Sequence, residues 1–194
     1  MVAVSRGRIG RTRSFSRRRP RFWFLVKSRL SARPPLLSRS FCGFGLAMDD
    51  DQIRTLVARF DTNDNSVRNE AWQQLRELDE RVVPFFEDFF GHAKKLAARR
   101  DIAFHCIRYA RTSEAAFRVG LLAIGDKSTI VRYRGCCVLA YSLRRDALAA
   151  LTGLLDHSDA KTVEDAKAAI DAIRNQNHHY FVDRGHSGQM FWEV

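Results

Sequence analysis

The sequence contains no long apolar segment. A helix needs about 20 consecutive apolar residues to cross a bilayer, whereas the longest apolar run within the first 48 residues is only the five residues 22–26. Lys27 ends that run, so the Arg18-Arg19 pair before it is not followed by the apolar region of a twin-arginine export signal. These observations argue against a membrane span and against export.

Cysteine is scarce, and its spacing is not that of a metal site. The chain has four cysteines and no Cys-x-x-Cys pair. On a helix the neighbours Cys136 and Cys137 would point about 100° apart, which suits small buried side chains better than zinc ligands. Because no disulfide is required, nothing points to an oxidising compartment, and we expect a cytoplasmic protein.

Acidic residues are missing from one part of the chain. Residues 1–48 carry 12 Lys and Arg without a single Asp or Glu, whereas residues 49–194 carry 21 Lys and Arg against 22 Asp and Glu. The net charge is therefore +12 in the first segment and −1 in the second. The second segment lacks the overall positive charge that is typical of nucleic-acid-binding domains.

Three interpretations of this basic leader remain open. An Arg- and Ser-rich segment without acids is typical of a mitochondrial transit peptide. It also suits a disordered arm that binds nucleic acid. The third interpretation is translation from an upstream start codon, and it is favoured because Met48 directly precedes Asp49-Asp50-Asp51, an acidic opening for a helix. All three predict that residues 1–47 lie outside the packed fold.

The motifs of common enzyme classes are also absent. The chain has no nucleophile elbow, no phosphate-binding glycine loop and no zincin helix. His178, His179 and His186 near the end have no accompanying carboxylate pattern, so they are a weak signal for a metal site. We therefore expect a protein that is not an enzyme, uses no cofactor and has no assigned metal ligands.

One pattern occurs about four times at nearly fixed spacing. The clearest copy is Val67-Arg68-x-x-Ala71-x-x-x-Leu75-x-x-Leu78, and the copies start 32, 32 and 31 residues apart. The others are Arg99-Arg100-x-x-Ala103-x-x-x-Ile107, Val131-Arg132-x-x-Gly135-x-x-x-Leu139 and Thr162-Val163-x-x-Ala166-x-x-x-Ile170. Such a period indicates stacked helix pairs. The small fifth residue of each copy predicts a close approach between paired helices.

Apolar residues at helical spacing predict four pairs of helices. Ser66 is the expected N-cap of the second helix, and Pro84 is tolerated in the first turn of the third. The predicted helices cover about residues 50–60 and 66–78, 82–90 and 97–111, 113–124 and 129–144, and 146–155 and 160–175.

These repeated residues resemble the HEAT repeat, in its short bacterial form. The resemblance implies an all-α fold, a right-handed α-α superhelix (solenoid) of about four HEAT-like helix pairs over residues 48–176. It also implies that Asp61 pairs with Arg68, and Asp126 with Arg132, across the turn between helices and between repeats. The recurring arginines would then set the register of the scaffold rather than bind a ligand.

In a HEAT-like solenoid the second helix of each pair lines the concave face. The polar and aromatic residues predicted there are His105, Arg108, Tyr109, Tyr133, Arg134, Tyr141, Arg144 and Arg145. Arg and Tyr are enriched at protein interfaces, so the resemblance favours an adaptor or an immunity-type protein with an acidic protein partner. Nucleic-acid binding or DNA repair is the alternative, since the same side chains suit a phosphate backbone. A merely solvated helix face is the third interpretation.

The end of the chain, residues 177–194, has a different pattern. Two β-prone runs, residues 178–182 and 189–194, flank the connection Asp183-Arg184-Gly185-His186-Ser187-Gly188. This arrangement predicts a hairpin or an extended segment. Phe181, Phe191 and Trp192 would cover the last apolar face of the repeats.

Overall fold

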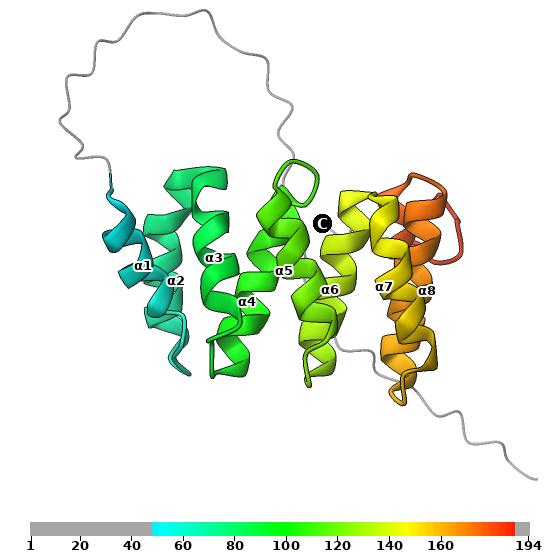
Figure 1. The fold of residues 1–194 in the computed structure, drawn as a ribbon, viewed down its shortest axis with the longest axis horizontal. Coiled ribbons are helices and arrows are strands. Elements are labelled where there is room, and N and C mark those ends of the chain that lie inside the picture. Colours follow the sequence, from blue (N-terminus) through cyan, green and yellow to red (C-terminus); the bar gives the residue numbers. More distant parts are fainter. Residues whose placement is uncertain (1–47, 189–194) are drawn as a thin grey trace, which may run out of the picture. The chain divides into compact units, whose positions relative to one another are not determined.

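The computed structural model describes residues 48–188, which belong to one compact unit of the chain. The predicted leader, residues 1–47, and the second β-prone run, residues 189–194, lie outside the described residues. Within residues 48–188 every regular element is a helix, which confirms the predicted all-α class (Figure 1). The α-helices are α1 (Asp50–Ala58), α2 (Asn65–Leu75), α3 (Val83–Phe90), α4 (Leu96–Cys106), α5 (Glu114–Ile124), α6 (Thr129–Ser142), α7 (Leu148–Gly153) and α8 (Ala160–Arg174).

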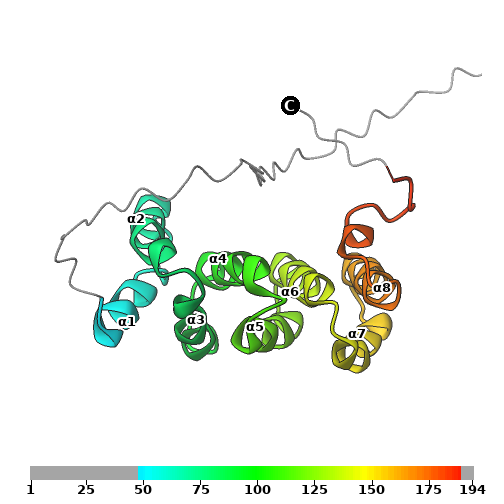
Figure 2. The same cartoon turned by 90° about the horizontal axis from the view of Figure 1, so that it is seen from above.

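The helices form two rows (Figure 2). The first row contains α1, α3, α5 and α7, and the second row contains α2, α4, α6 and α8. Each helix of the first row contacts the helix that follows it in the chain, and contacts also join α1 to α3, α3 to α5, α4 to α6 and α6 to α8. Two buried apolar clusters lie between the helices, one formed largely by α1–α5 and the other by α5–α8 with the tail. The core therefore depends on neighbouring pairs.

Short polar side chains cap the N-termini of several helices. Asp49 and Gln52 form a complete capping box at α1, and Ser113 and Asp159 accept backbone N–H groups at α5 and α8. The predicted cap at Ser66 is wrong. Asp64 caps α2 by accepting from the Ser66 backbone N–H at 2.8 Å, because the helix begins one residue before Ser66.

Three arginines of the second row make the same internal contact. The guanidinium groups of Arg68, Arg99 and Arg132 each donate to the backbone carbonyl six residues earlier, at Thr62, Ala93 and Asp126, over 2.8, 2.9 and 2.7 Å. These carbonyls lie in the turn before each helix. The three arginines therefore fasten each turn to the helix that follows it.

Each arginine also reaches an acid of the next helix pair. Arg68 pairs with Asp101 at 2.8 Å, Arg99 with Asp126 at 2.5 Å, and Arg132 with Asp159 at 2.8 Å. The expected Asp61–Arg68 and Asp126–Arg132 ion pairs are therefore wrong, since each arginine side chain points forward to the next pair. Asp61 instead accepts from the Lys95 backbone N–H at 2.6 Å.

The register predicted for the second copy of the repeat is wrong by one residue. Arg99, and not Arg100, occupies the position of Arg68 and Arg132, as the shared carbonyl contact shows. Arg100 is partly exposed and donates to Asp101. Ile102 then takes the place of Ala71 in the first copy. The sequence pattern favours Arg100, because the small residue Ala103 follows it at the expected spacing, and only the helix packing shows that Arg99 continues the repeat.

The predicted close approach of paired helices is confirmed at Gly135. A Cβ atom added there would lie 2.7 Å from the Ile124 backbone nitrogen and 2.9 Å from the Ala123 carbonyl carbon. The backbones of α5 and α6 therefore approach too closely for any side chain at this position.

Helix ends in the middle of the chain differ from the prediction. α2 ends at Leu75 and continues as a 3-10 helix, Arg76–Val82, within which Asp79 has φ 50° and ψ −128°. α4 ends at Cys106, with a 3-10 turn from Ile107 to Tyr109. Periodicity alone did not detect these breaks, because apolar residues continue at helical spacing through both of them.

The predicted hairpin or extended segment near the C-terminus is wrong in its described half. His178–Phe181 form a 3-10 helix, whose first turn is capped by the Asn177 side chain. Phe181 is buried, with its ring 5.6 Å from that of Tyr133, and the segment contacts α6 and α8. Burial of Phe181 and the Asn177 cap therefore override the β-propensity of this run.

Among residues 48–188 no helix combines the length and the apolar character that a bilayer span requires.

Candidate functional site

The second row of helices carries a cluster of aromatic rings and one guanidinium group, which we call the aromatic–arginine cluster. Its members come from α2, α4 and α6. They are Trp72, Phe104, His105, Tyr133 and Arg134. Trp72 and His105 stack with their ring centroids 3.6 Å apart, and the Phe104 ring lies 5.3 Å from that of His105. Arg134 lies over Phe104 at 4.6 Å and over Tyr133 at 5.7 Å. The cluster therefore crosses three successive helices.

His105 is the covered centre of this cluster. Besides the stack on Trp72, its ring meets Phe60 edge-on at 6.0 Å. Burial lowers the pKa of His105 to about 4, Asp101 partly opposes that shift, and Arg134 reinforces it. The imidazole is therefore neutral at physiological pH and packs as an aromatic ring.

Arg134 holds its charge in a largely apolar site. Arg134 is only 8% exposed, and this burial lowers the pKa of its guanidinium group. The aromatic faces of Phe104 and Tyr133 compensate part of the lost hydration through cation–π contacts. Phe104 is 36% exposed. The arrangement thus presents an apolar ring to solvent, with a positive charge directly beneath it.

Two other predicted residues, Arg108 and Tyr109, lie just beyond the end of α4. Arg108 is exposed and forms an ion pair of 3.6 Å with Asp79, whose φ is 50°. Tyr109 is buried, and burial raises its pKa to about 12. Arg108 is therefore accessible, whereas the Tyr109 ring belongs to the core.

Tyr141, Arg144 and Arg145 lie toward the other end of α6. Tyr141 meets the His178 ring at 4.7 Å, so it packs against the tail. Arg144 pairs with Glu114 and Asp146 and lies 3.7 Å above the Phe117 ring, so it joins the turn after α6 to α5 of the first row. Arg145 is exposed in the turn to α7. The eight predicted residues are thus divided among three places: the aromatic–arginine cluster, the segment just beyond α4, and the end of α6 with the turn that follows it.

Two members of the cluster, Trp72 and Phe104, were not predicted. Trp72 follows the small residue Ala71 of the first copy, and Phe104 lies two residues after Ile102, which takes that position in the second copy. Trp72 and Phe104 therefore do not occupy equivalent positions of the repeat. The available signal was an aromatic residue on the second helix of each of the first two predicted pairs.

The histidines of the tail have other neighbours. The rings of His178 and His179 lie 4.0 Å apart, and His186 stacks on Tyr180 while its Nε2 approaches the Asp171 carboxylate at 2.5 Å. Across residues 48–188, no group of three or more His, Cys, Asp or Glu side chains gathers closely enough to hold a metal ion.

The described cysteines are poor nucleophiles. Cys106, Cys136 and Cys137 are all buried and unpaired with one another. Burial raises the pKa of each thiol, to about 12 for Cys136 and Cys137. Thiolate is the reactive form, so these side chains suit packing rather than catalysis.

No family model, curated protein or solved structure matches this chain at a significant level.

Proposed function

We propose that residues 48–176 form a short HEAT-like solenoid, a right-handed α-α superhelix, that serves as a non-catalytic protein-binding scaffold. The two rows of helices, and the contacts between successive pairs, support the proposed stacking. The repeated Arg68, Arg99 and Arg132 contacts support the idea that the pairs are structural repeats. In this proposal the partner binds to the second row of helices, which would line the concave side of the solenoid.

The aromatic–arginine cluster is the observation that carries this proposal. Aromatic and arginine side chains concentrate binding energy at protein interfaces, particularly where packing already holds them in place. Here the Trp72 and His105 rings stack on each other, the Arg134 guanidinium packs over Phe104, and Phe104 remains accessible. A partner that covers Phe104 would bury apolar surface above a positive charge.

The partner that best fits this surface is an acidic protein segment. Arg100 and Arg108, both partly or fully exposed, lie on or just after α4 and add positive charge near the cluster. Carboxylates of a partner would pair with these side chains at the rim. An apolar residue of the partner would contact Phe104.

Nucleic-acid binding is the alternative that the same side chains allow, because bases also stack on aromatic rings. The charge balance gives it less support. Residues 48–188 carry 21 Lys and Arg and 21 Asp and Glu, so their net charge is zero. Three of the arginines are also occupied by the internal contacts between pairs.

Affinity capture from native lysate with the full chain tests the proposal. We expect Phe104→Ala to reduce recovery of the captured partner about tenfold, the usual cost of losing an interface aromatic. Leu122→Ala is the matched control, since Leu122 is 50% exposed on α5 of the first row. Equal recovery with both variants would contradict the proposed face. Binding of labelled duplex DNA that weakens steeply with salt would favour the alternative instead.

A further inference from the structure

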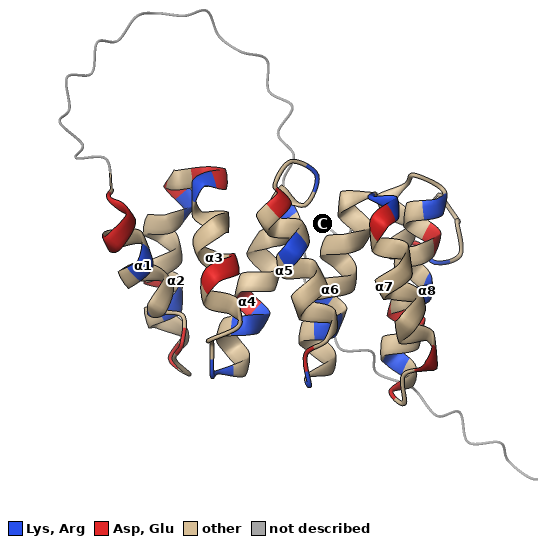
Figure 3. Cartoon of the chain, viewed as in Figure 1, with Lys and Arg blue, Asp and Glu red and all other residues tan. Residues whose placement is uncertain are grey.

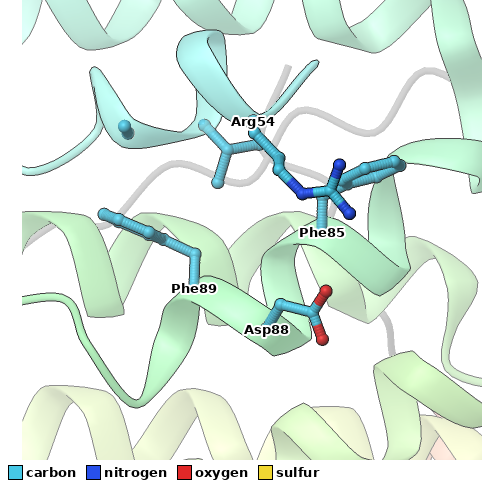
Figure 4. Close-up of a pocket in the computed structure, with 6 residues that line it drawn as sticks. Arg54, Phe85, Asp88 and Phe89 are labelled. Atoms are coloured by element: carbon cyan, nitrogen blue, oxygen red, sulfur yellow. The ribbon is translucent and has the colours of Figure 1, made fainter. Parts of the chain in front are cut away.

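An apolar hollow opens between α1 and α3, in the first row of helices and away from the aromatic–arginine cluster (Figure 4). Its volume is about 280 Å³. That is slightly below the range of small-molecule pockets, and it suits one large side chain better than a whole cofactor. The residues that line it are Arg54, Val57, Ala58, Phe85, Asp88 and Phe89.

The hollow follows from the spacing of residues on the two helices. Phe85 and Phe89 are four residues apart on α3, so they lie on one face, while Phe86 and Phe90 are buried in the core. On α1, Arg54 and Ala58 have the same spacing. Ala58 is exposed and has only a methyl group. It therefore leaves a space beside the two rings that a larger side chain at this position would fill.

The rim of the hollow is charged. Arg54 lies 5.3 Å above the Phe85 ring and 3.5 Å from Asp51. Asp88 is exposed, and among residues 48–188 its carboxylate makes no ion pair (Figure 4). The neighbouring Glu87, by contrast, is held by Arg118. Asp88 therefore offers a negative charge at the edge of an apolar surface.

The region around the hollow is also negative as a whole. Residues 48–91 carry five arginines and 11 Asp and Glu, a net charge of −6, whereas residues 92–188 carry 16 Lys and Arg and 10 Asp and Glu. Figure 3 shows the acids spread over α1 and the segment that joins α2 to α3. A ligand that approaches this end meets a negative field, so charge complementarity favours a basic partner.

We propose that the hollow is a docking site for a partner protein segment in which a large apolar side chain is flanked by Arg or Lys. The apolar side chain would enter between Phe85 and Phe89, and a flanking cation would pair with Asp88. This surface is separate from the cluster in position and opposite in charge. The proposal therefore stands or falls independently of the function proposed above, and it gives the scaffold a second binding surface.

A pair of labelled peptides tests this docking site on the full chain. The probe is Arg-Arg-Phe-Arg-Arg, and its reference is Arg-Arg-Ala-Arg-Arg, both followed by fluorescence anisotropy at about 150 mM salt to screen diffuse attraction. We expect the probe to bind about tenfold more tightly than the reference, as burial of one phenyl ring predicts. Equal affinity of the two peptides would overturn the proposal.

Three variants locate the binding. Ala58→Leu should fill the hollow and reduce probe affinity about tenfold to that of the reference. Asp88→Lys should reduce the affinity for the probe more than Asp156→Lys does. Asp156→Lys is the matched control, because it makes the same change of charge at an exposed acid in the turn after α7. All three sites are exposed, so thermal melting should show the fold unchanged.

Two further results would refute the docking site. One is a loss of probe affinity in Asp156→Lys equal to that in Asp88→Lys, since binding would then reflect net charge alone. The other is self-association of the chain that Ala58→Leu abolishes, since the occupant would then be a second copy rather than a basic partner. Sedimentation of the protein without peptide measures the latter.

Discussion

Replacement of Gly135 by alanine should destabilise this protein, although alanine is the better helix former. An added Cβ would lie 2.7 Å from the Ile124 nitrogen and 2.9 Å from two atoms of Ala123. Two of these three atoms belong to the backbone, which cannot rotate away as a side chain end could. Overpacking of this kind costs about 1–3 kcal/mol. The gain in helix propensity is about 1 kcal/mol, so we expect a net loss of up to about 2 kcal/mol.

The same substitution at Gly153 provides the control. Gly153 ends α7, and a Cβ added there would meet no atom within 4 Å. Alanine at this position should therefore leave stability unchanged or raise it by about 0.5 kcal/mol. Urea unfolding followed by far-ultraviolet circular dichroism measures both variants, and the slope of the transition should stay constant.

The comparison of the two variants decides whether the packing argument holds. We expect Gly135→Ala to unfold at a lower urea concentration than the wild type and Gly153→Ala at an equal or higher one. If Gly135→Ala is as stable as Gly153→Ala, then α5 and α6 do not approach as closely as described, and the reason given for a glycine at this place in the repeat is refuted.

Two further predictions concern the ionisable side chains of Arg132 and His105. Arg132→Ala should lower the free energy of unfolding in urea by about 2–4 kcal/mol, because it removes the ion pair to Asp159 and leaves the Asp126 carbonyl without its donor. The control Arg145→Ala should change this free energy by no more than about 0.5 kcal/mol. Equal effects of the two variants would contradict the structural role of Arg132. His105 should make stability depend on pH. Its folded pKa of about 4 lies below the ordinary histidine value of 6.5, so the unfolded state binds the proton more readily. Stability should therefore fall by at most about 3 kcal/mol as the pH drops from 6.5 toward 4. His105→Gln should lose that part of the slope, and an unchanged slope would show that His105 is not buried in the folded state.

The helices themselves could be predicted closely from the sequence. The start and end of α5, α6 and α8 lie within two residues of the predicted limits. This success has a local cause, since apolar spacing, capping residues and turn residues act over a few neighbouring positions. The 3-10 segments after α2 and α4 were missed because their apolar residues continue the helical period.

The candidate site was predictable only in part. His105, Tyr133 and Arg134 were expected on one face, and the structure brings them into one cluster, yet Trp72 and Phe104 complete it. Arg144 was expected on the same face and instead contacts α5 of the other row. Whether two side chains 30 residues apart meet depends on how the helices pack, and spacing within one helix carries no information about that.

The sequence by itself determined that residues 48–188 are all-helical, that their helices come in pairs of about 32 residues, and that the positive charge of the chain is concentrated before Met48. Those properties follow from local periodicity and composition. Only the tertiary structure decided that Arg99 rather than Arg100 continues the repeat, that each arginine points to the next pair, and that residues 178–181 are helical. These outcomes depend on burial and on partners distant in the chain, which compete with local preference and here prevail over it.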